Sequence, residues 1–301
     1  MDSKIDRRRF LKTSGTAAAG LSLSALSPST IPAADSSALD KLGWQFACQL
    51  YTFRRFSFYE AIEMIGKLGV KCVEPCFFLR LDKKRPQLKT NADLSPEVRR
   101  EMKQRLDDRG MKMISFYAGL GAEEAAARKT FEFAQQMGVR TIVAEPPAGA
   151  FDLLEKLCDE YEINLAVHNH PKRADKPDYR NWNPENVLAL CKDRGKRVGA
   201  CCDTGHWIRS GLKPVDCLKL MEGRIVSIHL KDVAEWNKPA ARDVPLGKGL
   251  ADYAAVLAEL KRQGFKGVMS LEYEHDSPQL MDEVAECLAF VQKTAGSLAG
   301  P

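Results

Sequence analysis

Five acidic or imidazole side chains each stand at the end of a short apolar run. They are Glu145, His168, Asp203, His229 and Glu272. Carboxylate oxygens and imidazole nitrogens bind divalent metal ions, and the same groups accept and release protons in catalysis. Each one alone has an ordinary explanation, since an acidic residue at a strand end often caps the next helix. Five in succession predict a metal-dependent active site.

The apolar runs have the length and spacing of β-strands that alternate with helices. Eight strands are predicted, at Phe46–Tyr51, Lys71–Phe77, Lys112–Tyr117, Thr141–Glu145, Asn164–His168, Val198–Asp203, Ile225–Leu230 and Gly267–Glu272. Amphipathic helices are predicted between them, as at Ser57–Leu68, Ser95–Arg109, Ala122–Met137 and Pro184–Arg194. Eight such units over residues 41–296 predict a single-domain α/β protein, a (β/α)8 TIM barrel whose strand ends meet at one rim.

An open, doubly wound sheet is the alternative architecture. Such a sheet would be expected to carry a glycine-rich phosphate-binding turn after its first strand. Here that stretch reads QLYTF over residues 49–53, and no GxGxxG or P-loop pattern occurs in the sequence. The nucleotide-binding alternative is therefore disfavoured.

The charge is concentrated at the N-terminus. The formal net charge is +5, and residues 1–34 contribute +3 of it through five basic and two acidic residues. The rest of the chain is nearly neutral, so it offers no electrostatic argument for nucleic acid or an anionic membrane as a partner.

Three short motifs in the second half of the chain are similar to motifs of a known enzyme superfamily. They are CDTGHW at residues 202–207, IHLKD at 228–232, and LGKG at 246–249 followed by SLEYE at 270–274. In this order and spacing they resemble the xylose-isomerase-like superfamily of sugar isomerases and epimerases. The match is strong from about residue 164 to 274, while over residues 45–145 only the alternation of strands and helices supports it.

The resemblance implies one bound divalent ion, Mn²⁺, Mg²⁺, Co²⁺ or Zn²⁺, with Asp203, His229 and Glu272 as ligands. The superfamily's epimerases usually place a metal-binding, proton-moving Glu on the fifth strand, whereas this chain has His168 there. Glu145, one strand earlier, is predicted to supply the fourth ligand, with His168 beside it as a ligand or a base.

The expected reaction is metal-assisted proton transfer next to the carbonyl of a small carbohydrate. The predicted catalytic residues are Glu145, Glu272, His168 and His206. The predicted substrate contacts are Lys231, His170, Trp207 and Tyr51. Return of the proton to another carbon or face makes an isomerase or epimerase, while loss of a neighbouring oxygen makes a lyase or dehydratase. The histidine-rich fifth strand resembles members that act on keto-inositols or 3-keto-glycosides, so elimination stays open.

Two other classes compete with these enzymes. Endonuclease IV-like proteins share the barrel, but their three-metal cluster needs further histidines where this chain has Glu74, Cys76 and Tyr117. A non-catalytic, exported sugar-binding protein would have a cleft lined by Tyr51, Trp207 and Trp236. Such a protein would have no reason to keep a complete set of metal ligands.

The first 34 residues resemble a twin-arginine signal peptide. RRRFLK at residues 7–12 precedes a weakly hydrophobic run and the small residues IPAA at 31–34. The run is a poor membrane anchor because it is rich in Ala, Ser and Gly and contains Pro28. We expect an exported, periplasmic or extracytoplasmic protein. The nine cysteines form no CxxC pair, and most are expected to be buried rather than joined in disulfides.

Overall fold

The computed structural model describes residues 37–300, so the predicted signal peptide lies outside the described residues. Within them, nine strands form one sheet in the order β3-β2-β1-β11-β8-β7-β6-β5-β4, and neighbouring strands are parallel. The strands are β1 (Gln45–Gln49), β2 (Cys72–Glu74), β3 (Lys112–Met113), β4 (Ser115–Tyr117), β5 (Thr141–Ala144), β6 (Asn164–His168), β7 (Val198–Asp203), β8 (Ile225–Leu230) and β11 (Val268–Leu271).

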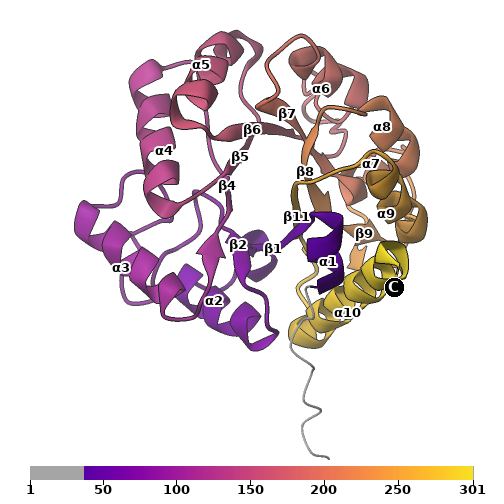
Figure 1. Cartoon of the computed structure of the whole chain (residues 1–301), viewed down its shortest axis with the longest axis horizontal. Helices are drawn as coiled ribbons and strands as arrows, with labels where there is room; N and C mark the ends of the chain where they lie inside the picture. The colour runs from indigo at the N-terminus through magenta and orange to yellow at the C-terminus, as the bar shows by residue number, and fades with distance from the viewer. Residues whose placement is uncertain (1–36, 301) are drawn as a thin grey trace, which may run out of the picture. The chain divides into compact units, whose positions relative to one another are not determined.

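The sheet closes into a barrel at residues 112–117. Only Ile114 separates β3, which pairs with β2, from β4, which pairs with β5. β3 and β4 are therefore two halves of one barrel strand, and eight strand positions surround the axis (Figure 1). The predicted fold class, a single-domain (β/α)8 TIM barrel, is confirmed.

Helices cover the outside of the strands, as Figure 1 shows. They are α1 (Ser37–Leu42), α2 (Phe58–Lys67), α3 (Pro96–Asp107), α4 (Glu124–Met137), α5 (Phe151–Tyr161), α6 (Pro184–Cys191), α7 (Thr204–Arg209), α8 (Pro214–Leu220), α9 (Tyr253–Arg262) and α10 (Leu280–Ala299), with 3-10 turns at Leu50–Phe53 and Ala148–Ala150. Local signals set their ends. Ser57 and Glu60 form a capping box before α2, and Gly138, with φ of 80°, ends α4 in a left-handed conformation that costs glycine little.

The strand positions are confirmed, but some predicted ends are wrong. The first strand stops at Gln49 instead of Tyr51, because the Gln49 side chain accepts a hydrogen bond from the Tyr51 amide and starts a 3-10 turn. The residues of that turn are as apolar as those of the strand, so hydropathy alone predicted a longer strand. The fourth barrel strand likewise ends at Ala144, one residue before Glu145.

Successive strand residues face opposite sides of the barrel wall, which creates two separate apolar layers. Ile142, Leu165 and Cys202 belong to the main core beneath the helices. Val143, Ala166 and Cys201 form a small cluster of their own inside the barrel. This alternation decides which strand-terminal residues point to the barrel axis.

All nine cysteines lie among the described residues and all are free, eight of them buried and Cys72 half-buried. Burial raises the pKa of most of these thiols, to about 12 for Cys158 and Cys191. Among residues 37–300, no helix combines the length and hydropathy needed to cross a membrane.

Candidate metal centre and active site

The strand-terminal residues of the second half of the barrel face its interior. Asp203 lies two residues after the interior Cys201, and His168 two after the interior Ala166. On β7 and β8, Asp203 pairs in register with His229. The parallel strands therefore place these side chains around one point at the barrel's carboxyl end.

Four of these side chains form a compact group: His168, Asp203, His229 and Glu272. Each offers a ligand atom within 4.8 Å of the others, and all four residues are buried. The shortest separation is 3.0 Å between His229 Nδ1 and Glu272 Oε2, and Asp203 Oδ2 lies 3.7 Å from His168 Nε2 and 3.9 Å from His229 Nδ1. Two imidazoles and two carboxylates make a mixed set that suits Zn²⁺, Mn²⁺ or Co²⁺.

Two buried atoms of this group make no hydrogen bond to any described residue. They are His168 Nε2 and Asp203 Oδ2, although Lys231 Nζ lies 3.0 Å from the latter as an ion pair. A buried polar atom without a hydrogen bond is costly, so His168 Nε2 above all is expected to meet a ligand or ion, whereas Asp203 Oδ2 already has the Lys231 ammonium beside it. Their convergence fits a metal ion bound by these four residues.

Asp203 both ends a strand and starts a helix. Its Oδ1 accepts a hydrogen bond from the His206 amide and so caps α7, which leaves Oδ2 facing the barrel axis. The helix-capping explanation and the metal-ligand explanation therefore hold for different oxygens of one carboxylate.

A buried carboxylate, Glu74, lies behind the His229 imidazole and fixes its orientation. His229 Nε2 donates to Glu74 Oε1 at 2.7 Å, while Nδ1 lies 3.0 Å from Glu272 Oε2 and 3.9 Å from Asp203 Oδ2. With Nε2 held by Glu74, Nδ1 is the ring nitrogen that can bind a metal ion. Ser270 donates to the other Glu74 oxygen at 2.7 Å. Burial opposes ionisation of Glu74, but its contacts with His229 and Ser270 outweigh burial and hold its pKa below the ordinary value.

Replacing Glu74 with Gln is expected to weaken metal binding by about 10- to 100-fold, because the amide no longer fixes the His229 tautomer as a carboxylate does. Chelator competition measures the affinity, and Glu97→Gln, at an exposed position on α3, is the control. Unchanged affinity in Glu74→Gln would show that His229 does not bind the ion through Nδ1.

Glu145 lies in a neighbouring group instead of among the four. Its carboxylate contacts His168 Nδ1 at 3.4 Å and His170 Nδ1 more closely, and the Tyr117 hydroxyl donates to it at 3.0 Å. Burial would raise the pKa of Glu145, yet the two histidines hold it far below its ordinary value. The structure thus brings His168, not Glu145, together with Asp203, His229 and Glu272. It places Glu145 behind His168, at the end of β6, and His170, two residues beyond that end.

Lys231 is fully buried and contacts three carboxylates. Its Nζ lies 3.0 Å from oxygens of Asp203, Glu272 and Glu274. Burial would lower the pKa of this ammonium, but the carboxylates outweigh it and raise the pKa well above the usual range. Gly205 makes room for its stem, since a Cβ there would lie 2.5 Å from Lys231 Cγ. Lys231 does not line the cavity itself, so its predicted contact with the substrate stays a prediction.

Asp232 instead organises the loop that follows β8. Its two carboxylate oxygens accept hydrogen bonds from the amides of Val233, Gly247, Gly249 and Ala251 at 2.9–3.0 Å. The motifs at residues 228–232 and 246–249 are thus two parts of one structural unit, held together beside the site.

His206 is buried between two cationic side chains. Arg209 Nη1 lies 3.1 Å from its Nδ1 and Lys231 Nζ lies 3.2 Å from its Nε2. Burial, assisted by Lys231, lowers the pKa of His206 well below its ordinary value despite Asp203. Arg209 is itself fixed by ion pairs with Asp243 and Glu274.

A cavity of about 690 Å³ opens above this group. Its polar wall includes His168, His170, His206, Arg209, Glu272 and Glu274. Its apolar wall includes Tyr51, Phe78, Tyr117, Pro171, Ala174, Pro239 and Ala240. Buried reactive groups at the end of a cavity of this size are typical of a small-molecule active site.

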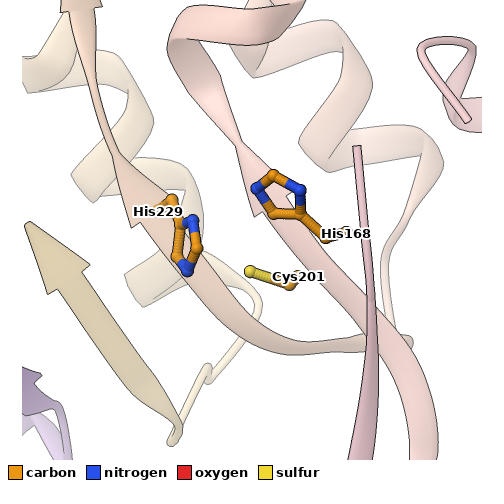
Figure 2. A group of neighbouring side chains, drawn as sticks. All are labelled: His168, Cys201 and His229. Atoms are coloured by element: carbon orange, nitrogen blue, oxygen red, sulfur yellow. The ribbon is translucent and has the colours of Figure 1, made fainter. Parts of the chain in front are cut away.

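Figure 2 shows a further group, with the imidazoles of His168 and His229 near the Cys201 thiol of the strand between them. Cys201 lies two residues below Asp203 on the same face of β7 and packs against Val143 and Ala166. Its sulfur is therefore deeper in the barrel than the four-residue group, beneath the cavity.

Comparisons with known proteins agree with this geometry. Residues 62–293, well over half of the chain, match the family described as xylose isomerase-like TIM barrel. The chain belongs to that family. A rhizopine catabolism protein, MocC, of Rhizobium meliloti is 32% identical over 142 residues, which are 42% of each chain. The chain therefore spans under half the length of this relative.

Solved structures also align over most of the chain. An uncharacterised protein from Parabacteroides distasonis is 31% identical, with a TM-score of 0.65 over 83% of this chain and 99% of its own. An IolI protein with a bound zinc atom is 19% identical, with a TM-score of 0.64 over 83% of this chain and 96% of its own. The second likeness, at this identity, concerns the fold alone.

Within this xylose isomerase-like barrel, most predicted site residues gather at one rim, but Trp207 does not. Tyr51, His170 and His206 line the cavity, whereas the Trp207 side chain is buried in the core because α7 turns it away from the axis. Sequence reasoning passed over Glu74, Arg209 and Glu274 as site residues. Glu274 stood in the quoted SLEYE motif, and Glu74 was named only in the comparison with endonuclease IV-like proteins, while nothing marked Arg209 beyond its charge.

Proposed function

We propose that this protein is a divalent-metal-dependent enzyme that isomerises or epimerises a small carbohydrate by moving a proton next to a carbonyl. The observation that carries this proposal is the convergence of His168 Nε2 and Asp203 Oδ2, buried and without hydrogen bonds in the described chain, at the base of the cavity. The zinc of the IolI structure and the catabolic role named for MocC support it.

His168, Asp203, His229 and Glu272 would hold the ion. When bound, a divalent ion polarises the carbonyl and hydroxyl oxygens of a sugar and lowers the cost of forming an enediolate. Glu74 and Glu145 would orient the two imidazoles through the ring nitrogens that face away from the ion.

Proton transfer would fall to groups on the cavity wall. Glu272 and His170 both line the cavity, and Glu145 holds His170 from behind. The carboxylate would accept a proton from carbon or return one, and the imidazole would do so at a second position. His206 also lines the cavity and would stabilise negative charge that develops on a substrate oxygen, with the buried Lys231 ammonium behind it and beside Glu272.

Elimination is the second candidate reaction, because the two proton-moving groups differ in kind. Glu272 is a carboxylate, whereas His170 is an imidazole backed by Glu145. Unlike groups suit a reaction in which one removes a proton from carbon and the other protonates a departing hydroxyl or glycosyl oxygen. The substrate would then be a keto-sugar, keto-inositol or 3-keto-glycoside.

Product analysis in D2O tests both reactions. Isomerisation or epimerisation is expected to give an isomer of the substrate in which solvent deuterium replaces a carbon-bound hydrogen. Elimination is expected to give a product that has lost water or an alcohol. Mass spectrometry and NMR of metal-loaded enzyme with keto-sugars distinguish the two. Sugar binding with no deuterium exchange and no product would instead favour the non-catalytic sugar-binding alternative.

We also propose that the protein is exported by the twin-arginine route, on the strength of the RRRFLK sequence at residues 7–12. Replacing Arg7 and Arg8 with Lys is expected to leave uncleaved precursor inside the cell. Fractionation and intact mass measure this. An unprocessed wild-type protein found only in the cytoplasm would overturn the proposal.

A further inference from the structure

The cavity is larger than a single sugar ring requires. Its volume of about 690 Å³ equals on the order of two dozen water molecules at about 30 Å³ each, whereas a hexose has about a dozen non-hydrogen atoms. A monosaccharide whose carbonyl lies at the four-residue group would leave the outer part of the cavity empty.

The two parts of the cavity differ in chemistry. The base carries the imidazoles and carboxylates described above, while the outer wall is largely apolar. Tyr51 and Phe78 form one side of it, and Pro171, Ala174, Pro239 and Ala240 contribute from two loops. A fully hydroxylated sugar suits the base but gains little from such an outer wall.

Phe78 is the most exposed aromatic side chain of this outer wall. It is 39% exposed, one of four large apolar side chains that stand out in this way among the described residues. Its ring meets Tyr51 edge-on at 6.0 Å and Phe77 at 5.1 Å. Phe77 is held by a hydrogen bond from its amide to the Tyr117 carbonyl, so the segment that presents Phe78 is fixed.

The charged side chains that line the cavity are already paired with protein groups. Arg173 forms an ion pair with Asp175 at 2.7 Å, and Arg209 pairs with Asp243 and Glu274. Both arginines of the lining therefore already have a carboxylate partner, which disfavours a phosphate or carboxylate as the outer group of a ligand. The outer wall suits an uncharged group.

We propose that the outer part of the cavity, centred on Phe78 and Tyr51, is a subsite for an aromatic or other apolar group attached to the sugar. The substrate is then a glycoside with an apolar aglycone rather than a free or phosphorylated monosaccharide. This inference rests on the proposed function for the orientation of the sugar, whose carbonyl end faces the four-residue group.

Matched ligands test the subsite without requiring turnover. Phenyl and methyl glucosides, in both the α and β forms, carry a hydroxyl where the substrate has its carbonyl and differ only in the aglycone. We expect the better phenyl glucoside to bind about tenfold more tightly than its methyl counterpart, by calorimetry on the metal-loaded protein. Equal affinity, or no binding of either pair, would overturn the proposal.

Variants locate the effect. Phe78→Ala is expected to abolish most of the phenyl preference, and Phe78→Tyr to keep it. Leu220→Ala is the control, because Leu220 is similarly exposed, at 41%, but does not line the cavity. An undiminished preference in Phe78→Ala would overturn the assignment. Because deuterium exchange on simple keto-sugars reports the proposed reaction separately, failure of the subsite and failure of the reaction are distinguishable.

Discussion

Replacing His229 with Ala is expected to remove the bound metal ion and to lower turnover by about three orders of magnitude. His229 is buried beside Asp203 and Glu272 and is fixed by Glu74, so no other described imidazole can take its place without moving. The loss follows because a metal Lewis acid supplies several kcal/mol at the transition state and each factor of ten in rate corresponds to about 1.4 kcal/mol.

The metal content of the purified wild-type protein and of the variant tests this prediction. We expect about one ion per chain in the wild type and almost none in His229→Ala. His275→Ala is the matched control, since this histidine lies near the rim but outside the four-residue group. Full metal content in His229→Ala would place the ion elsewhere. Two or three ions in the wild type would revive an endonuclease-like cluster.

Replacing Glu145 with Gln is expected to lower kcat by about 10²- to 10⁴-fold at saturating metal, with a much smaller change in KM. The carboxylate orients His170 on the cavity wall, and an amide at the end of such a pair can hold the wrong imidazole tautomer. Glu145 is a positioning residue, because it acts on the substrate through His170 and His168.

Steady-state kinetics over a range of pH check this prediction, because loss of the carboxylate should also shift the pH profile of kcat. Glu145→Asp is expected to restore part of the rate, which a purely structural role would not produce. Glu160→Gln, on the surface of α5, is the control, because its exposed ion pair with Arg128 contributes little. An unchanged kcat in Glu145→Gln would remove the Glu145–His170 pair from the mechanism.

The barrel could be predicted because its signal is repeated. Eight apolar runs, each followed by an amphipathic stretch, specify strands and helices even where single boundaries are wrong. The boundary at Gln49 was missed because Leu50–Phe53 is as apolar as the strand before it, and only a side-chain cap marks the change. The interruption of the third barrel strand at Ile114 likewise leaves no trace in hydropathy.

The site was predicted less completely than the fold. Strand ends are visible in the sequence, so Asp203, His229 and Glu272 could be named together, and the structure brings them together. The fourth residue of the group could not be predicted in this way, because the choice depends on how far each side chain extends toward the other three. In the structure His168 lies within reach of Asp203, His229 and Glu272, whereas Glu145 does not belong to that group. Glu74 ends a strand of only three residues, and its contact with His229 joins positions far apart in the chain.

The buried cysteines can report local unfolding of the barrel, because each thiol reacts only after the structure around it opens. Only the thiolate reacts with alkylating or disulfide reagents, and burial raises the pKa of thiols such as Cys158 and Cys217 to about 12, so the native state offers these reagents little to attack. Cys158 lies in α5, Cys217 in α8 and Cys287 in α10, while Cys48 and Cys202 lie in β1 and β7. The order in which reagents label these positions would therefore trace which sectors of the barrel separate first.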